Sequence, residues 1–212
     1  MTDKSRVTEF TNTLVSDAAD YGVEITPDSF DRLAAYYMLL DSWNPRLHLV
    51  APCSPREFAR RHVLESLVLL PHLPRDARVA DIGSGAGLPI LPCLIARSDV
   101  KATLFESSKK KAVFLREALK QTGTSATVIA QRFEETVTPQ VEFVSCRALE
   151  RFAQMLPTLI QWAPPESTLL LFGGIRLRER LQESVNFEEI RVPNSDSRFL
   201  FVARENPRNH TK

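Results

Sequence analysis

The chain has 212 residues, of which 43% are hydrophobic and 25% charged. This balance excludes collagen-like and disordered proteins and fits one globular domain, with room for a small appendage. Its 27 Lys and Arg residues nearly cancel its 26 Asp and Glu residues, so the net charge of +1 indicates no class of partner. Its three cysteines form no C-x-x-C pair, and its apolar runs are too short for a signal peptide or a membrane span. We expect a cytoplasmic monomer without a disulfide framework, a metal site or a membrane anchor.

The first 75 residues are predicted to form three helices, over 5–19, 27–45 and 55–70, because apolar side chains recur there at helical spacing. Thr26 followed by Pro27 is a typical helix start, since Thr caps the first turn and Pro needs no N–H there. Pro45 is predicted to end the second helix, because proline disfavours the helical conformation in the residue before it. We expect residues 1–75 to form a helical cap and residues 76–212 to form the core.

From residue 78 onward the sequence alternates between strands and helices. Strands are predicted over 78–82, 102–106, 127–130, 142–145, 168–172, 187–192 and 198–204. Helices are predicted over 88–96, 108–121, 149–161 and 175–184. Such alternation is typical of an α/β protein whose parallel sheet is covered by helices on both faces. Because only a turn separates the last two strands, we expect a seven-stranded, mostly parallel sheet that closes with an antiparallel hairpin.

The first predicted strand opens into a glycine-rich turn. Residues 79–88 read V-A-D-I-G-S-G-A-G-L, a strand that ends in an acid and three alternate glycines directly before a helix. Glycine permits a positive φ and the close approach of a ligand to the backbone. A dinucleotide fingerprint, G-x-G-x-x-G, requires glycine in place of Leu88. The D-x-G-x-G-x-G spacing instead resembles motif I of S-adenosylmethionine-dependent methyltransferases, and the alternative is a turn that only tightens strand-to-helix packing.

A carboxylate, Glu106, follows the second predicted strand roughly 20 residues beyond the glycines. In nucleoside-binding doubly wound folds an acid in this place accepts hydrogen bonds from the ribose hydroxyls, and the alternative is a solvated acid at a strand end. Lys109, Lys110 and Lys111 then open a helix, where their charges oppose the helix dipole. RNA phosphates would offset this unfavourable placement, and the alternative is a solvated basic turn.

Taken together, these motifs resemble the bacterial 16S rRNA guanine-N7 methyltransferases, once called glucose-inhibited division protein B. The matching segments stand in the family's order from about residue 30 to residue 204. They are Trp43-Asn44, Arg61-His62-Val63-Leu64-Glu65-Ser66, the run from Asp81 to Pro89, Glu106-Ser107, Lys110-Lys111 with Phe114-Leu115-Arg116, Arg132-Phe133-Glu134-Glu135, and Arg147-Ala148. The resemblance implies a Rossmann-like class I methyltransferase fold with a helical N-terminal cap, and S-adenosylmethionine as the methyl donor.

The resemblance also implies which residues hold the donor and the base. The donor-binding residues would be Asp81, Gly83, Gly85, Gly87, Leu88, Glu106, Phe133, Glu134 and Arg147. Phe133 and Glu134 would flank the adenine, and Arg147 would be the catalytic residue, beside the donor where the base enters. The alternatives are a core side chain for Phe133, an exposed loop acid for Glu134 and an ion pair with Glu150 for Arg147.

RNA contacts are predicted for a set of basic side chains, namely Arg61, His62, Lys109, Lys110, Lys111 and Arg116. A purely structural role for His62 on its helix is an equal alternative. The chain departs from the family pattern at three places on the acceptor side. His48-Leu49-Val50 replaces Asn-Leu-Thr, Cys146 replaces a serine, and Phe172-Gly173-Gly174 lacks the usual lysine. These departures leave the donor motif unchanged.

The reaction implied by the resemblance is methylation of N7 of an unpaired guanine in 16S rRNA, in the family guanine 527 of the 530 loop. N7 carries a lone pair and no proton, so its methylation needs no general base and depends on the positioning of the reactants. Free rRNA and an assembling small ribosomal subunit are both open as partners. The alternatives are a small-molecule methyltransferase and a non-catalytic RNA- or nucleoside-binding module.

Overall fold

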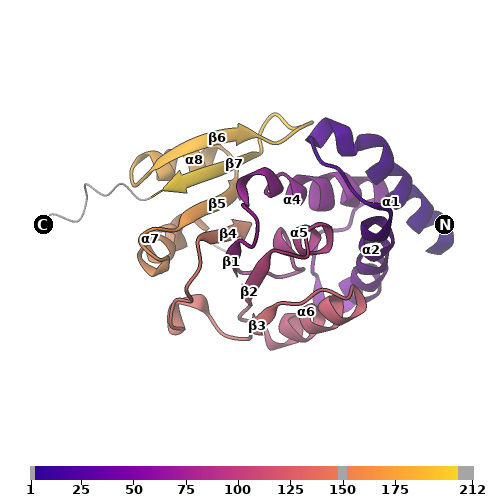
Figure 1. Ribbon diagram of the computed structural model, residues 1–212, viewed down its shortest axis with the longest axis horizontal. Coiled ribbons are helices and arrows are strands. Elements are labelled where there is room, and N and C mark those ends of the chain that lie inside the picture. The colour runs from indigo at the N-terminus through magenta and orange to yellow at the C-terminus, as the bar shows by residue number, and fades with distance from the viewer. Residues whose placement is uncertain (1–2, 148–151, 205–212) are drawn as a thin grey trace, which may run out of the picture.

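The computed structural model describes residues 3–147 and 152–204, which build one sheet with helices on both faces (Figure 1). The strand order is β3-β2-β1-β4-β5-β7-β6. The strands are β1 (Arg78–Ile82), β2 (Lys101–Phe105), β3 (Thr127–Ile129), β4 (Phe143–Arg147), β5 (Thr168–Gly173), β6 (Asn186–Arg191) and β7 (Phe199–Arg204). Strands β1 to β5 pair in parallel, and β7 lies antiparallel between β5 and β6. The predicted seven-stranded sheet and its closing hairpin are confirmed.

The helices follow the predicted alternation. They are α1 (Asp3–Asp17), α2 (Pro27–Leu47), α3 (Pro55–Phe58), α4 (Glu65–Leu67), α5 (Ile90–Ala96), α6 (Lys109–Gln121), α7 (Phe152–Trp162) and α8 (Ile175–Gln182). Short turns of other helix types are η1 (Ala18–Tyr21), η2 (Ala59–Leu64), η3 (Leu70–His72) and η4 (Phe133–Glu135). The predicted helix start at residue 149 lies outside the described residues. Within the described ranges, no helix combines the length and the apolar character needed to cross a bilayer.

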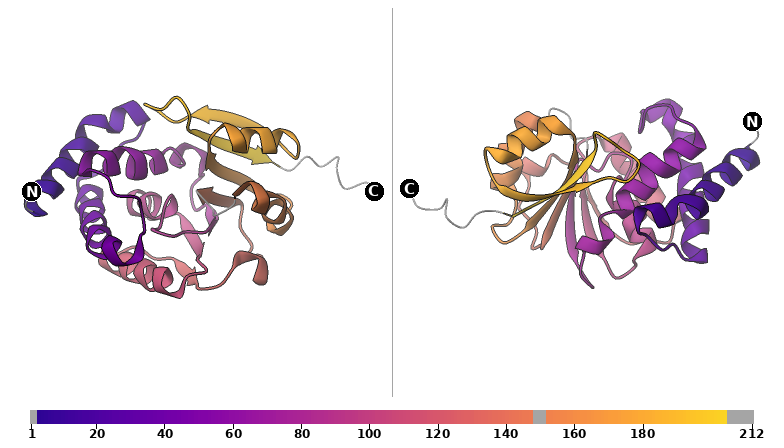
Figure 2. Two further views of the ribbon diagram at one scale, coloured as in Figure 1. Left: turned by 180° about the vertical axis from the view of Figure 1, so that it is seen from behind. Right: turned by 90° about the horizontal axis from the view of Figure 1, so that it is seen from above.

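The two faces of the sheet pack against different helices (Figure 2). Successive side chains along a strand point to opposite faces, so Val79 and Ala80 belong to different cores. Val79 lies in the larger core, together with apolar residues of the N-terminal helices, α5 and α6. Ala80 lies in the smaller core, with Leu156 of α7 and Leu177 of α8. The carboxyl ends of the parallel strands lie together at one edge of the sheet.

The N-terminal helices share the larger core with the sheet, since Phe10 and Leu33 belong to the same buried cluster as Val79. Polar contacts reinforce the junction, because the buried Tyr36 hydroxyl donates to the Ala86 carbonyl at 2.8 Å. The change from helices to alternating elements therefore occurs within one hydrophobic core. A domain boundary at residue 75 remains a prediction.

The prediction that α2 ends at Pro45 is wrong, because the helix continues to Leu47 with Pro45 inside its last turn. Two sets of contacts stabilise this last turn. His48 adopts a left-handed conformation and its N–H donates to the Asn44 carbonyl at 2.9 Å. The Asn44 side chain bonds both the N–H and the carbonyl of Val50, at 3.0 Å each. Proline near a helix end sacrifices only one backbone hydrogen bond, which these contacts offset.

The predicted continuous helix over 55–70 is interrupted by the π-helical segment η2 between α3 and α4. At the end of this segment the N–H of Glu65 donates to the Arg60 carbonyl, five residues earlier. Phe58 and Val63, also five residues apart, are both buried. A π turn places residues at this spacing on one face, so burial of both side chains favours the wider turn.

Replacing Tyr36 by Phe tests how firmly the cap is attached. The change leaves the buried Ala86 carbonyl without its donor, and we expect the free energy of unfolding in urea to fall by about 1–3 kcal/mol. Tyr37→Phe is the control on the same helix, because the Tyr37 hydroxyl interacts with Arg6 of the cap and not with the turn after β1. Equal losses in the two variants would contradict an attachment role for the Tyr36 hydroxyl.

Candidate active site

The carboxyl ends of β1, β2 and β4 meet at one edge of the sheet and border a pocket of about 530 Å³. Ligands of open α/β sheets bind at this edge. The pocket is lined by predicted site residues from three strand ends and from the cap, namely Gly83, Gly85, Leu88, Glu106, His62, Lys111 and Arg147. The fold therefore brings the glycine turn, the acid and the arginine together as the sequence predicted.

The glycine-rich turn uses its glycines for two different purposes. Gly83, Gly85 and Gly87 all have positive φ values, of 69°, 53° and 89°. A Cβ on Gly85 would meet nothing closer than the Gly83 carbonyl oxygen at 3.6 Å, so this position faces open pocket. A Cβ on Gly87 would lie 2.9 Å from the Cβ of Leu91, which is too close. Gly85 thus keeps the pocket open, whereas Gly87, which does not line it, permits α5 to pack.

Glu106 connects the glycine turn to the start of α6. Its carboxylate is buried and accepts hydrogen bonds from the backbone N–H of Gly85 at 2.8 Å and of Ser108 at 2.7 Å. A carboxylate has about four acceptor positions, so its two oxygens retain capacity for further donors such as hydroxyl groups. This geometry is compatible with the predicted ribose contact, which stays a prediction.

Asp81 lies beneath the turn and does not line the pocket. Its carboxyl group is fully buried and accepts a hydrogen bond from the Ser145 hydroxyl at 2.6 Å. Burial raises the pKa of Asp81 to about 7, and its Oδ2 atom has no hydrogen-bond partner among the described residues. The Asp81 side chain therefore joins β1 to β4, and the structure gives no support to its predicted direct contact with the donor.

Phe133 and Glu134 also lie away from the pocket lining, in η4 after β3. The Phe133 ring packs edge-on against Trp162 of α7, with centroids 5.5 Å apart, and is buried in the smaller core. Glu134 forms an ion pair with Arg132 at 3.3 Å. The structure therefore shows Phe133 as a core side chain, which is the alternative noted from the sequence. The contacts of Phe133 and Glu134 with adenine remain a prediction.

Arg147 ends β4 and is the guanidinium that lines the pocket. Its Nη1 donates to the Ser66 hydroxyl at 3.4 Å, and its Nη2 donates to the Arg61 carbonyl and to Glu65 at 3.1 Å. The guanidinium also lies over the Phe172 ring, 5.6 Å from its centroid. The alternative partner, Glu150, lies outside the described residues. Arg147 is therefore held by the cap and by β5 at the border of the pocket.

The predicted RNA-binding residues divide into two groups. Lys111 and His62 line the pocket, and Lys109 and Lys110 are exposed beside it in the first turn of α6. Two others are engaged elsewhere, since Arg61 pairs with Glu57 at 2.8 Å and Arg116 donates to the Val128 carbonyl at 3.1 Å.

His62 is half-buried beside Phe58 and lies within the electrostatic influence of three arginines. Its ring centroid lies 5.1 Å from that of Phe58, and its Nδ1 atom has no hydrogen-bond partner in the described part of the chain. Burial, followed by the charges of Arg147, Arg61 and Arg198, lowers the pKa of His62 to about 3. The imidazole is consequently neutral at physiological pH.

Two contributions of the cap were not among the predicted site residues, although Leu49 and Val50 stand in a segment that the sequence placed on the acceptor side. Leu49, Val50 and Ala51, which follow α2, line the pocket. Among the described residues between α1 and α3, no other segment lines the pocket. Glu65 and Ser66 belong to a motif that the sequence singled out, yet nothing in the sequence indicated that they contact Arg147.

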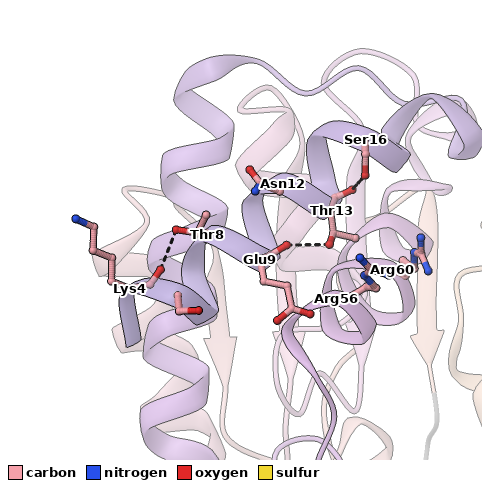
Figure 3. A pocket seen from close by; sticks show the side chains of 9 residues that line it. Lys4, Thr8, Glu9, Asn12, Thr13, Ser16, Arg56 and Arg60 are labelled. Carbon is pink, nitrogen blue, oxygen red and sulfur yellow. Dashed lines mark hydrogen bonds between the residues drawn. The ribbon is translucent and has the colours of Figure 1, made fainter. Parts of the chain in front are cut away.

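A second, more open pocket of about 740 Å³ lies on the cap between α1 and the segment from α3 to η2 (Figure 3). Its polar groups bond mainly within the cap. The hydroxyls of Thr8 and Thr13 donate to carbonyls of their own helix, and Arg60 pairs with Asp17. It holds none of the predicted site residues, so the pocket at the sheet edge is the candidate active site.

The neutral state of His62 predicts a pH dependence of stability. Because the pKa is about 3 in the folded chain and 6.5 as the ordinary value, the unfolded chain binds a proton that the folded chain excludes between these values. The contribution of His62 to stability therefore falls as the pH falls from 6.5. We expect His62→Gln to reduce the drop in melting temperature between pH 7.5 and pH 5. His48→Gln, at an exposed site, is the control, and an unchanged drop in His62→Gln would contradict the assignment.

Comparison with solved structures supports the fold. A SAM-dependent methyltransferase from Aquifex aeolicus superimposes with a TM-score of 0.54 at 15% identity, covering 65% of this chain and 88% of that chain. MtNAS, solved in complex with MTA and tNA, superimposes with a TM-score of 0.60 at 15% identity, covering 83% and 70%. At such low identity the likeness shows the fold alone, and it confirms the predicted Rossmann-like methyltransferase fold.

Comparison at the sequence level is closer. Ribosomal RNA small subunit methyltransferase G of Rhodospirillum centenum is 37% identical over 175 residues, which cover 82% of this chain and 81% of the relative. The protein of the same name from Hyphomonas neptunium is 32% identical over 187 residues, covering 86% and 90%. A family model described as rRNA small subunit methyltransferase G matches residues 29–198. This match spans the cap from α2 onward and the pocket, and the chain belongs to the rRNA small subunit methyltransferase G family.

Proposed function

We propose that the chain transfers the methyl group of S-adenosylmethionine to N7 of an unpaired guanine in the rRNA of the small ribosomal subunit. The observation that carries the proposal is the pairing of the open face at Gly85 with the buried Glu106 carboxylate, in a pocket that Arg147 also lines. Membership of the family supports the same function. Gly85 and Glu106 suit a nucleoside donor, and Arg147 brings positive charge to the place where RNA would arrive.

The residues present fit the donor. Gly83 and Gly85 leave backbone exposed to the pocket, Leu88 adds an apolar contact, and Glu106 offers carboxylate oxygens for hydroxyl groups. When bound, S-adenosylmethionine supplies a methyl group activated on a positively charged sulfonium. A carboxylate beside the pocket is favourable for such a cationic ligand.

The acceptor side needs positioning rather than proton transfer. Guanine N7 attacks through a lone pair, so no side chain has to remove a proton, and well-oriented reactants recover about 7–11 kcal/mol of the barrier. Accordingly, His62 lines the pocket, but its pKa of about 3 makes it a weak base. Arg147 supplies N–H donors at the pocket border, suited to guanine O6 or to a phosphate.

The target base must be accessible on its Hoogsteen edge. The major groove of an A-form helix is deep and narrow, so N7 of a paired guanine is hidden there, and a base in an unpaired loop is the suitable substrate. The lysines at the start of α6 lie beside the pocket, where phosphates flanking such a base would pass. We infer that the protein acts as a monomer on free rRNA or on an assembling small subunit.

Incubation with labelled S-adenosylmethionine tests the function. Small-subunit rRNA and assembling small-subunit particles serve as separate substrates, followed by mapping of the modified base. The proposal predicts label on N7 of one loop guanine. Label on a small molecule from a cell extract and none on RNA would favour a small-molecule methyltransferase, whereas donor binding without transfer to any acceptor would favour a binding module.

Gly85→Val tests the donor site. S-adenosylmethionine at a hundredfold excess over its Kd should stabilise the parent by about 2.7 kcal/mol, measured as a rise in melting temperature. We expect the variant to lose this rise, because its side chain would enter the open pocket. Gly123→Val is the control, since Gly123 has a similar φ of +61° and open space around it but does not line the pocket. A full rise in Gly85→Val would place the donor elsewhere.

Neutralising Lys110 and Lys111 together tests the RNA contact. We expect weaker RNA binding, and a salt dependence reduced by about 0.7 to 0.9 log units per lost phosphate contact, with unchanged donor affinity. The matched control is Lys101→Gln with Lys120→Gln, two exposed lysines at the start of β2 and the far end of α6. An unchanged salt slope in the Lys110 and Lys111 variant would leave these lysines as a solvated helix turn.

A further inference from the structure

Glu65 of α4 is a buried carboxylate shared by two arginines from distant parts of the sheet. It is 1% exposed. Its Oε2 lies 3.1 Å from Nη2 of Arg147 at the end of β4, and its Oε1 lies 2.8 Å from Nη2 of Arg198, directly before β7. One side chain of the cap therefore contacts both the pocket arginine and the closing hairpin.

Stability alone does not explain this cluster. Burial raises the pKa of Glu65, against the opposing influence of Arg147, Arg198 and Arg61. The cost of removing such charges from water often exceeds their mutual attraction, and apolar residues of similar volume frequently stabilise a fold as well or better. A buried ion cluster can instead serve to hold its charged groups in one defined arrangement.

The contacts of Arg147 show that the cluster fixes the position of its guanidinium. Glu65, the Ser66 hydroxyl and the Arg61 carbonyl together accept three hydrogen bonds from its two Nη atoms. Because the Glu65 N–H donates to the Arg60 carbonyl in the π-helical register, it leaves the neighbouring Arg61 carbonyl to other donors. A guanidinium has five N–H groups, so two remain for a ligand once these three bonds are made among the described residues.

The two arginines have different positions relative to the pocket. Arg147 lines it, whereas Arg198 does not, although both contact the same carboxylate. A change at Arg198 can therefore serve as the control for a change at Glu65. Replacing Glu65 removes a contact of the pocket arginine, whereas replacing Arg198 removes only the other contact of the carboxylate.

Resting on the proposed function, we propose that Glu65 is a positioning residue for methyl transfer, which holds the Arg147 guanidinium at the border of the pocket. Arg147 contacts the incoming nucleotide, and Glu65 acts only through it. Arg198 balances the buried charge and takes no part in orienting the acceptor.

The side-chain signals of Arg147 provide a test that needs no activity. In protein labelled with ¹⁵N-arginine, the Arg147 guanidinium signal is identified by its absence in Arg147→Ala. In the parent, restricted rotation should give separate Nη signals. We expect Glu65→Gln to average them, because the amide replaces one charged acceptor oxygen with a donor, and Arg198→Gln to leave them separate. Unaltered Arg147 signals in a folded Glu65→Gln protein would overturn the proposal, whatever the protein methylates.

Methyl transfer provides the second test, in single turnovers at saturating donor and RNA. Parent activity, measured first, decides the proposed function; comparison of variants then decides the role of Glu65. We expect Glu65→Gln to slow transfer by between about tenfold and 100-fold with unchanged donor affinity, because small displacements of a positioned group have effects of this size. Arg198→Gln should stay within about twofold of the parent. Equal slowing in both variants would indicate a structural cluster and overturn the proposal.

A double-mutant cycle separates positioning from general damage. Once Arg147 is replaced by Ala, Glu65→Gln should slow transfer no further, since the two residues act as one unit. Additional slowing in that background would contradict the proposal. Glu65→Asp serves if Glu65→Gln fails to fold, because it keeps the charge but withdraws it from Arg147. It should show the same averaging of the Arg147 signals and the same coupling to Arg147→Ala.

Discussion

The bridge formed by the Glu106 carboxylate between Gly85 and Ser108 determines the shape of the site. It joins the turn after β1 to the first turn of α6, so two neighbouring connections act as one wall. The turn is also bonded to the neighbouring strand, because the N–H groups of Gly83 and Ser84 both donate to the Phe105 carbonyl. Because hydrogen bonds fix the turn at Gly83, Ser84 and Gly85, its backbone can border the pocket at Gly85 without moving into it. A rigid donor wall is what a reaction limited by positioning requires.

The cap contributes part of the pocket wall. Its core is continuous with that of the sheet, Tyr36 holds the turn at Ala86, and the residues after α2 line the pocket. Its π-helical segment supplies the carbonyl of Arg61, and the next helix supplies Glu65, for the arginine at the end of β4. The pocket is therefore built by different parts of the chain, with the glycine turn and Glu106 on the sheet and Leu49, Val50, Ala51 and His62 on the cap.

Local patterns predicted most of the fold and the donor wall. Alternating strands and helices gave the sheet, and the glycine spacing with Glu106 indicated a nucleoside-type site, because turn chemistry and periodicity depend on residues close in the chain. Patterns of this kind were insufficient at Pro45, where contacts of Asn44 with Val50 outweigh the usual effect of proline. They were insufficient again at Phe133, whose ring direction depends on Trp162 of another helix.

The sequence by itself determined that this chain is an α/β protein, that its first strand ends in a ligand turn and which family it resembles. Only the tertiary structure decided that Asp81 lies under the turn, that Gly87 serves packing and that Arg147 shares a buried carboxylate with Arg198. The physical reason is distance along the chain. Backbone conformation is set by neighbouring residues, whereas burial and ion pairing depend on which side chains the hydrophobic core brings together.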